Sequence, residues 1–152
     1  MTEIVDDLQV AAPVSAVWDA IADPARHAHW HPFVTAITGR HDEGATRSCE
    51  VIVGRKRGRT EERCLQRDEQ QQIAWRIDSD TTSFSKMVSD WRAGFRLAGA
   101  PQAEATTVTA FSSFAPAKPL VRLAMPLIRR RFHHTQRAIL AALKRHVESQ
   151  HR

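Results

Sequence analysis

Four histidines lie close together in the sequence: His27, His29 and His31 form an H-x-H-x-H pattern, and His41 follows. On a β-strand the first three would share a face and could bind zinc, whereas on a helix only His27 and His31 would. The segment has helical spacing and stops before Pro32, which argues against a complete ligand set. We therefore expect histidines on a helix surface and no metal site.

The two cysteines, Cys49 and Cys64, are the candidate disulfide partners or nucleophiles. A tight turn centred between Lys56 and Arg57 would place them opposite each other on neighbouring strands. They could then form a cross-strand disulfide or remain reduced packing residues, and the pattern leaves this redox state open. The six glycines are scattered, so the sequence has no phosphate-binding loop and we expect no cofactor.

Glu62 is the candidate acid–base residue. The same register, with the next turn centred between Asp68 and Glu69, places Glu62 on the inner face of a sheet beside Val51 and Trp75. A carboxylate there must be paired, protonated or wetted by a cavity. Two interpretations stay open: Glu62 lies in solvent at the open end of the sheet, or it is a polar anchor or acid–base group inside a pocket.

The register also predicts which charges face each other on the outer, solvated side of this sheet. Glu50 would lie opposite Arg63, and Glu61 opposite Arg76. Opposite charges that face each other across strands are favourable, so these pairs support the assignment of the outer face.

Hydrophobic periodicity predicts the elements that must position these residues. Glu3 to Ala11 is a strand candidate, Pro13 opens a helix that Asp23-Pro24 stops, and a second short helix covers Pro24 to about Trp30. Six further strands with hairpin-type turns are predicted at Phe33–Arg40, Arg47–Val53, Arg59–Arg67, Gln71–Ile77, Ser85–Leu97 and Thr106–Phe114.

After Pro116 the sequence returns to helical spacing, which predicts a long amphipathic C-terminal helix. Pro126 should kink this helix or split off a leading turn. The apolar face must cover something, and the only large partner is one face of the sheet. The predicted buried face comprises Leu127, Ile128, Phe132, Ile139, Leu143 and Val147.

Two later strands carry the pattern expected of a ligand-binding wall. Met87, Ser89, Trp91 and Phe95 alternate onto one face, and Ser112 and Phe114 belong to a plausible partner face. An aromatic and aliphatic wall with a few small polar groups is typical of a small-molecule site. The same residues could instead pack against the last helix and leave no cavity.

Composition and charge describe a compact single domain and exclude several classes. The chain has 152 residues, 42% of them hydrophobic, and a net charge of +5. No apolar run approaches the roughly 20 residues of a membrane-spanning helix. The N-terminus does not resemble a secretory signal, so a cytoplasmic location is expected.

The densest basic cluster is Arg129-Arg130-Arg131. A solvated helix face is the usual explanation, and contact with anionic lipid head groups at a membrane surface is the alternative. Phe132 is the only interleaved aromatic and falls on the buried face, so nucleic-acid binding is not expected. The oligomeric state stays open.

The order of elements and several motifs resemble the START-like, helix-grip superfamily (SRPBCC), in its polyketide cyclase/dehydratase branch. The motifs are Ala12-Pro13-Val14-Ser15-Ala16-Val17-Trp18-Asp19-Ala20-Ile21-Ala22-Asp23-Pro24, His27, Trp30-His31-Pro32, Trp91, Thr107-Val108 and Leu143-Lys144-Arg145-His146-Val147-Glu148. The resemblance implies one α+β domain over residues 1–152. A seven-stranded antiparallel sheet would wrap around the long C-terminal helix, with two short helices after the first strand.

This resemblance leads to the expectation that a hydrophobic small molecule (a lipid, polyketide or aromatic) binds between the sheet and the C-terminal helix. The expected ligand-binding residues are Glu62, Trp75, Met87, Ser89, Trp91, Phe95, Ser112 and Phe114. One alternative is a polyketide cyclase or dehydratase that uses Glu62; a second is a protein-interaction module with a filled core. The chain has no tyrosine, which excludes a mechanism that needs a phenol acid.

Overall fold

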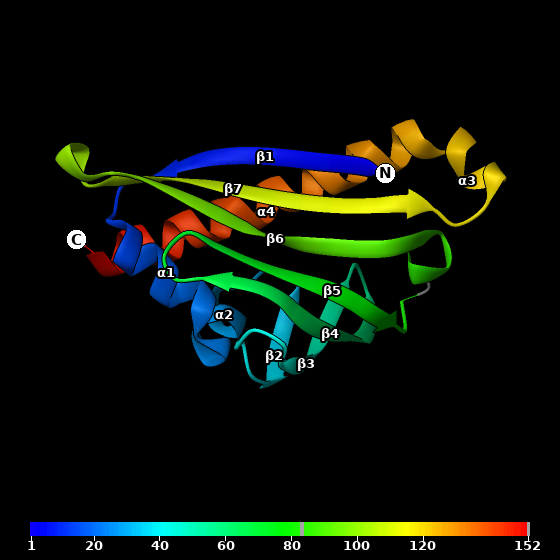
Figure 1. Cartoon of the computed structure of the whole chain (residues 1–152), viewed down its shortest axis with the longest axis horizontal. Helices are drawn as coiled ribbons and strands as arrows, with labels where there is room; N and C mark the ends of the chain where they lie inside the picture. The colour runs from blue at the N-terminus through cyan, green and yellow to red at the C-terminus, as the bar shows by residue number, and fades with distance from the viewer. Residues whose placement is uncertain (83, 152) are drawn as a thin grey trace.

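The strands of the computed structural model, which describes residues 1–82 and 84–151, form one antiparallel sheet. Their order across the sheet is β1-β7-β6-β5-β4-β3-β2, so β1 and β2 are the two edges. Figure 1 shows the long strands β1, β7 and β6 side by side. The strands are β1 (Thr2–Val10), β2 (Val34–Gly39), β3 (Thr46–Val53), β4 (Lys56–Asp68), β5 (Gln72–Asp80), β6 (Val88–Ala100) and β7 (Ala105–Pro116).

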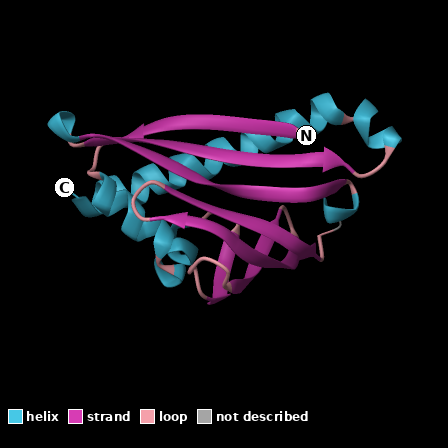
Figure 2. Ribbon diagram, viewed as in Figure 1, coloured by secondary structure: helices cyan, strands magenta, loops and turns pink. Residues whose placement is uncertain are grey.

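The long C-terminal helix lies along one face of this sheet (Figures 1 and 2) and packs against β1 and β7. The predicted α+β helix-grip arrangement is confirmed, including the two short helices that follow β1. Among the described residues, no helix combines the length and apolar character needed to cross a bilayer. The helices are α1 (Val14–Ala22), α2 (Pro24–Trp30), α3 (Pro119–Leu123) and α4 (Met125–His151), and two short 3-10 turns, Phe84–Lys86 and Pro101–Ala103, flank β6.

Prolines and caps set the helix boundaries, as the sequence predicts. Asp23 is extended, and its side chain accepts a hydrogen bond from the Ala25 amide at 3.1 Å, so it both ends α1 and caps α2. Near the C-terminus the helix is divided at Ala124, just before Pro126, which confirms the predicted leading turn.

The two hairpins that contain Glu62 have different registers from those predicted. The β3–β4 turn lies at Gly54-Arg55, where Gly54 has a positive φ of 63°. Cys49 therefore faces Thr60 rather than Cys64. In the β3–β4 hairpin the displacement is an even number of residues, so Cys49 and Glu62 keep their predicted face even though their partners change. Both cysteines are free and buried.

The charge pairs predicted from that register are wrong for the same reason. Glu50 lies opposite Arg59, and Arg63 lies opposite Arg76 instead of Glu50. Glu61 lies opposite Ser79. The outer face is still the charged one, but these contacts differ from the predicted contacts.

A β-bulge near the start of β6 overturns the predicted placement of Met87 and Ser89. The register shifts by one residue between Ser89 and Arg92, where Asp90 adopts a positive φ of 49°. The inward-facing side chain before the bulge is therefore Val88, which is buried, while Met87 and Ser89 are exposed. The wall predicted by simple alternation thus begins only at Trp91.

The interior divides into two clusters of apolar side chains. The larger one joins α1, α2 and the second half of α4 to the sheet, and includes Trp75 and Phe95. The smaller one lies under the first half of α4 and includes Phe114 and Phe132, with Trp91 packed against it. Leu127, which was predicted to be buried, is 69% exposed because Ile128 and Phe132 occupy the inner face at that end.

Candidate functional site

An ion pair between Arg47 and Glu62 lies on the inner face of the sheet. The two residues face each other across β3 and β4. The Arg47 Nη2 atom lies 2.7 Å and its Nε atom 3.1 Å from Glu62 Oε1. Both side chains are nearly excluded from solvent, with exposed fractions of 7% and 11%. The Glu62 carboxylate on the inner face is therefore compensated by an ion-pair partner, which is one of the possibilities the sequence left open.

Other polar atoms of Arg47 and Glu62 also have hydrogen-bond partners. Thr60 Oγ1 donates to Glu62 Oε2 at 2.6 Å, and Arg47 Nη1 donates to His41 Nε2 at 2.7 Å. The guanidinium carbon of Arg47 lies 3.8 Å from the centroid of the Trp75 ring, a cation–π geometry. Glu62 thus acts as an acceptor that orients Arg47 over the indole.

Histidine and tryptophan side chains satisfy two carbonyl groups at the C-terminal end of α1. The Nδ1 atoms of His27 and His41 lie 3.1 and 3.2 Å from the carbonyl oxygen of Ile21. The indole N–H of Trp30 donates to the Ala20 carbonyl at 2.8 Å. Since a carbonyl only accepts, both histidines carry their proton on Nδ1. The motif around His27 and Trp30 therefore joins α2 to α1.

Burial keeps these imidazoles neutral. Desolvation, reinforced by the positive charge of Arg47, lowers the pKa of His41 and of His31 from 6.5 to about 3. The same two causes lower the pKa of His27 well below its ordinary value. The His31 Nδ1 atom accepts the backbone N–H groups of Phe33 and Val34, so its proton is on Nε2.

The predicted surface location of these histidines is wrong for His27, which is 2% exposed. Its ring stacks on Trp30 and His31, with centroids 5.1 and 5.4 Å away, and meets Trp75 edge-on at 5.7 Å. His29 lies apart from this group, against His146. No cluster of three or more potential metal ligands occurs among the residues that the structure describes.

Two small side chains, Ala93 and Ser112, lie beside Trp75 on the inner face of the sheet. Ala93 on β6 lies between Ser112 on β7 and Trp75 on β5. Ser112 and Trp75 are buried, yet Ala93 is partly exposed although β6 is an interior strand of the sheet. Ala93 is therefore less enclosed than either of its cross-strand neighbours.

Two tryptophans that neighbour Ala93 in the sheet have indole N–H groups without a hydrogen-bond acceptor among the described residues. Trp75 is the cross-strand partner of Ala93, and Trp91 precedes it on β6 by two residues. The Nε1 atoms of both are buried and have no partner among the described residues. An unpaired buried donor costs about 1–3 kcal/mol, so each is a position where a bound acceptor would be stabilising.

Apart from Ser112, the predicted ligand-binding residues fall into three groups in the structure. Trp75 and Phe95 belong to the larger cluster, and Glu62 is linked to Trp75 through Arg47. Trp91 and Phe114 belong to the smaller cluster, where both rings contact the ring of Phe132. Met87 and Ser89 are exposed, and the hydroxyl of Ser89 donates to the Ala115 carbonyl at 3.5 Å.

The hydroxyl of Ser112 is already engaged by the helix. It donates to Gln136 Oε1 at 2.8 Å, and Gln136 Nε2 donates to Asp6 Oδ2 at 2.8 Å. Asp6 on β1 also contacts His133 and Arg137 of α4, at 2.9 and 3.2 Å. This network fixes α4 on the sheet between the two apolar clusters.

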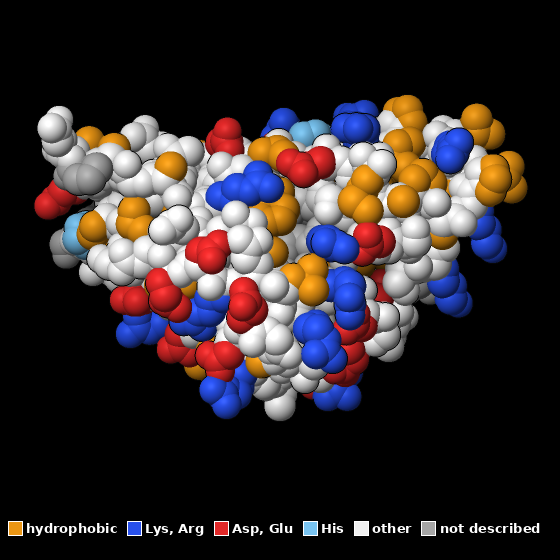
Figure 3. Space-filling model, in the orientation of Figure 1, with side chains coloured by type: hydrophobic (Ala, Val, Ile, Leu, Met, Phe, Trp, Pro, Cys, Tyr) orange, Lys and Arg blue, Asp and Glu red, His pale blue; other side chains and the backbone are white. Residues whose placement is uncertain are grey.

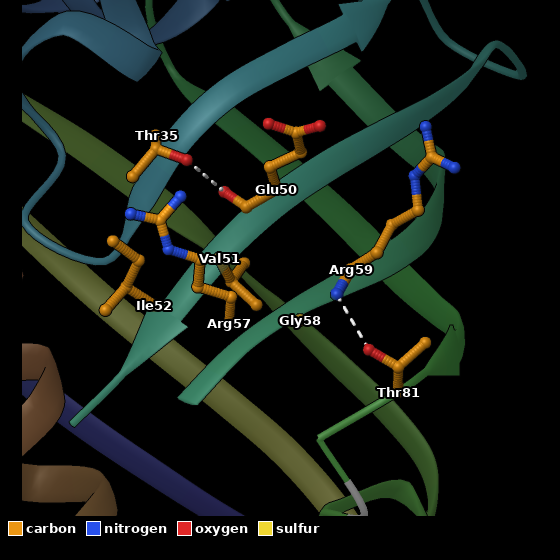
Figure 4. A pocket seen from close by; sticks show the side chains of 8 residues that line it. All are labelled: Thr35, Glu50, Val51, Ile52, Arg57, Gly58, Arg59 and Thr81. Atoms are coloured by element: carbon orange, nitrogen blue, oxygen red, sulfur yellow. Dashed lines mark hydrogen bonds between the residues drawn. The ribbon is translucent and has the colours of Figure 1, made fainter. Parts of the chain in front are cut away.

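Hollows on the outside of the molecule have a different character. One, of about 440 Å³, is drawn in Figure 4 and includes the charged side chains of Glu50, Arg57 and Arg59. Another, of about 510 Å³, is lined by Trp18, Arg67 and other mostly polar groups. Neither is lined by a predicted ligand-binding residue. We therefore centre the candidate site on the inner face around Ala93.

Arg47 is the site residue that sequence reasoning missed. It lies two positions before Cys49 on the same strand, so alternation places both on the inner face. The correct register also sets it opposite Glu62. A search for a basic partner at an inward position near Glu62 could have found it.

Comparison with known proteins agrees with this architecture. Among solved structures, a START superfamily protein from Mycobacterium smegmatis has a TM-score of 0.79 and 14% identity, over 97% of this chain and 98% of that one. The Zhui aromatase/cyclase from Streptomyces sp. R1128 has a TM-score of 0.79 and 19% identity, over 99% and 96%. At these identities the likeness shows the fold alone. No curated protein matches the sequence.

The family comparison is more specific. Residues 1–148 match the family model described as polyketide cyclase / dehydrase and lipid transport. The match covers α1, α2, α3, all seven strands and nearly all of α4. This chain therefore belongs to the polyketide cyclase/dehydrase and lipid transport family and has its START-like, helix-grip fold.

Proposed function

We propose that the protein binds a hydrophobic small molecule on the inner face of the sheet, beneath α4. The observation that carries this proposal is the partly exposed Ala93 beside Trp75 and Trp91, two residues whose buried indole N–H groups are unpaired. The family and the fold are both compatible with binding of a lipid, a polyketide or an aromatic compound. The wall is apolar, so burial of apolar ligand surface would drive binding.

The unpaired donors suggest the chemistry of the ligand. An indole N–H can only donate, so it is matched by an acceptor such as a ketone, quinone or carboxyl oxygen. The buried histidines are neutral, and the charges of Arg47 and Glu62 compensate each other. The site therefore has little net charge to attract an ionic ligand. We therefore expect an uncharged or weakly polar molecule with an aromatic or acyl body and at least one carbonyl group.

Filling the space beside Ala93 tests the location. Ala93→Leu should abolish binding of polyketide-like ketones, quinones and fatty acids, measured by isothermal titration and by thermal shift. The matched control is Ala98→Leu, because Ala98 lies on the same strand but is exposed on the outer face. If Ala93→Leu and Ala98→Leu bind the ligand with equal affinity, the ligand does not bind on the inner face.

Removing one donor tests the polar contact separately. Trp75→Phe keeps an aromatic ring and deletes the N–H, so the ligand Kd should rise about three- to tenfold, as expected for one hydrogen bond. Trp18→Phe is the control, because its N–H is already bonded to Glu69 Oε2 at 2.9 Å. If no ketone, quinone or fatty acid stabilises the protein, the interior is a filled core. That result would support the alternative function, a protein-interaction module.

A second candidate function is polyketide cyclisation or dehydration. It is favoured by Glu62 and His41, which both contact Arg47, and by His27, which lies against Trp75, since such reactions need positioned proton acceptors and donors. Binding without product would favour a carrier. Turnover that Glu62→Gln abolishes while ligand binding persists would favour an enzyme. Glu61→Gln, on the neighbouring outward position, is the control.

A further inference from the structure

A row of leucines on α3 and the first turn of α4 projects into solvent. Leu120, Leu123 and Leu127 are 78%, 82% and 69% exposed. Leu120 and Leu123 are three residues apart and share one side of α3, and Leu127 follows on the first turn of α4 beyond the division at Ala124. The opposite side, with Val121, Met125 and Ile128, packs on the smaller apolar cluster. The outward leucines are therefore not needed to cover the core.

The same segment carries a one-sided charge. Residues 105–147 contain no Asp or Glu. Lys118 and Arg122 lie beside the leucines, and Arg129, Arg130 and Arg131 follow them on α4. All five cations are exposed, and none forms an ion pair within the described part of the chain. Figure 3 shows apolar and basic side chains gathered over this end of the molecule.

We propose that α3 and the start of α4 dock the protein onto an anionic lipid bilayer. Exposed leucines would enter the head-group and acyl boundary, and the flanking cations would meet anionic head groups. Lipid offers both an apolar interior and a negative surface, which matches the order of these side chains along the helix. This surface is outside the interior site, so the proposal does not depend on the proposed ligand.

Other partners fit the surface less well. A second copy of the chain would bring two uniformly positive patches together, and like charges repel. A nucleic acid or acidic peptide would use the arginines but would leave the leucines exposed, and the outward face has no aromatic ring for stacking. An anionic membrane uses both features.

Vesicle cosedimentation tests the proposal. The wild-type chain should bind phosphatidylcholine vesicles that contain phosphatidylserine, bind pure phosphatidylcholine vesicles weakly, and lose affinity as salt is added. Arg129→Gln, Arg130→Gln and Arg131→Gln together should lower the partition coefficient by about fivefold for each arginine that faces the lipid. Leu120→Ser, Leu123→Ser and Leu127→Ser together should lower it about tenfold or more.

The chain contains a matched control for the basic cluster. Arg55, Lys56 and Arg57 are also consecutive and exposed, but they lie at the β3–β4 turn. Their triple change to Gln removes the same charge and should leave most of the binding intact. Equal losses in the two Gln triples would show nonspecific charge attraction and overturn the proposal.

A fluorescent label locates the surface directly. A bimane group on Leu123→Cys should be quenched by brominated lipids, while one on Val53→Cys should not. The native thiols are buried, so the new cysteine is the one that is labelled. Quenching at both positions, or at neither, would overturn the proposal. So would a dimer by light scattering that the Leu triple dissociates, or RNA binding that the Leu triple retains.

Discussion

Removing the guanidinium of Arg47 should destabilise the protein far more than removing an exposed arginine. The side chain is 7% exposed and pairs with Glu62 at 2.7 Å. In Arg47→Met the Glu62 carboxylate would remain nearly buried without its cation, and His41 would lose a donor. Breaking a buried ion pair from one side costs about 3–5 kcal/mol, which is a large fraction of the stability of a domain this size.

The double variant separates the cost of an orphaned charge from the value of the pair. Arg47→Met combined with Glu62→Leu leaves no buried charge, so its free energy of unfolding should lie above that of Arg47→Met alone. Thr60 and His41 still lose their partners, at about 1 kcal/mol each. A double variant more stable than the single one would show that these residues act as a unit.

Urea unfolding followed by far-ultraviolet circular dichroism supplies the free energies. The matched control is Arg59→Met, because Arg59 pairs with Glu61 at 3.6 Å and both side chains are about half exposed. Such a surface pair contributes about 0–1 kcal/mol. The reasoning is refuted if Arg47→Met and Arg59→Met lose the same stability, or if the losses from the two single variants simply add in the double variant.

Three further predictions concern protons, thiols and the attachment of α4. Burial and the charge of Arg47 lower the pKa of His41 to about 3, so the unfolded chain binds a proton first as the pH falls below 6.5. The free energy of unfolding should therefore decrease between pH 6.5 and about 3, with a slope of up to about 1.4 kcal/mol per pH unit from this group, and His41→Gln should flatten the curve. Burial raises the pKa of the Cys49 thiol to about 12, and Cys64 is buried too, so Ellman's reagent should label neither before unfolding and both afterwards; rapid labelling of the native chain would contradict this packing. Asp6→Ala should lower the free energy of unfolding by about 1.5–3 kcal/mol, because it removes an acceptor shared by three α4 side chains, whereas Asp7→Ala, on the outward face, should change it much less.

The faces of the strands could be predicted from the sequence because apolar alternation has a period of two. Trp75 and Glu62 lie on the inner side as expected, although both hairpin registers differ from the prediction. The turn chemistry decides the register, and the positive φ at Gly54 moved the first turn towards the N-terminus. At Glu62 and Trp75 the predicted face was retained, whereas the individual cross-strand pairs were not.

Bulges and tertiary partners were beyond such reasoning. The bulge at Asp90 reverses the alternation at Met87 and Ser89, and its sequence carries no glycine to signal a positive φ. Burial of His27 depends on the carbonyl groups at the end of α1, which is a contact between two helices and has no periodic signature. At these residues the conformation or burial depends on tertiary packing, which a local sequence pattern does not predict.

The four tryptophans allow the central proposal to be tested in one experiment. The indole N–H groups of Trp18 and Trp30 are already bonded, to Glu69 Oε2 and the Ala20 carbonyl, whereas those of Trp75 and Trp91 are unpaired. In ¹H–¹⁵N spectra recorded during titration with a hydrophobic ketone, quinone or fatty acid, we predict that the Trp75 and Trp91 indole protons move downfield and the other two stay in place. Tight binding that shifts only the Trp18 or Trp30 signals would contradict a ligand site on the inner face of the sheet.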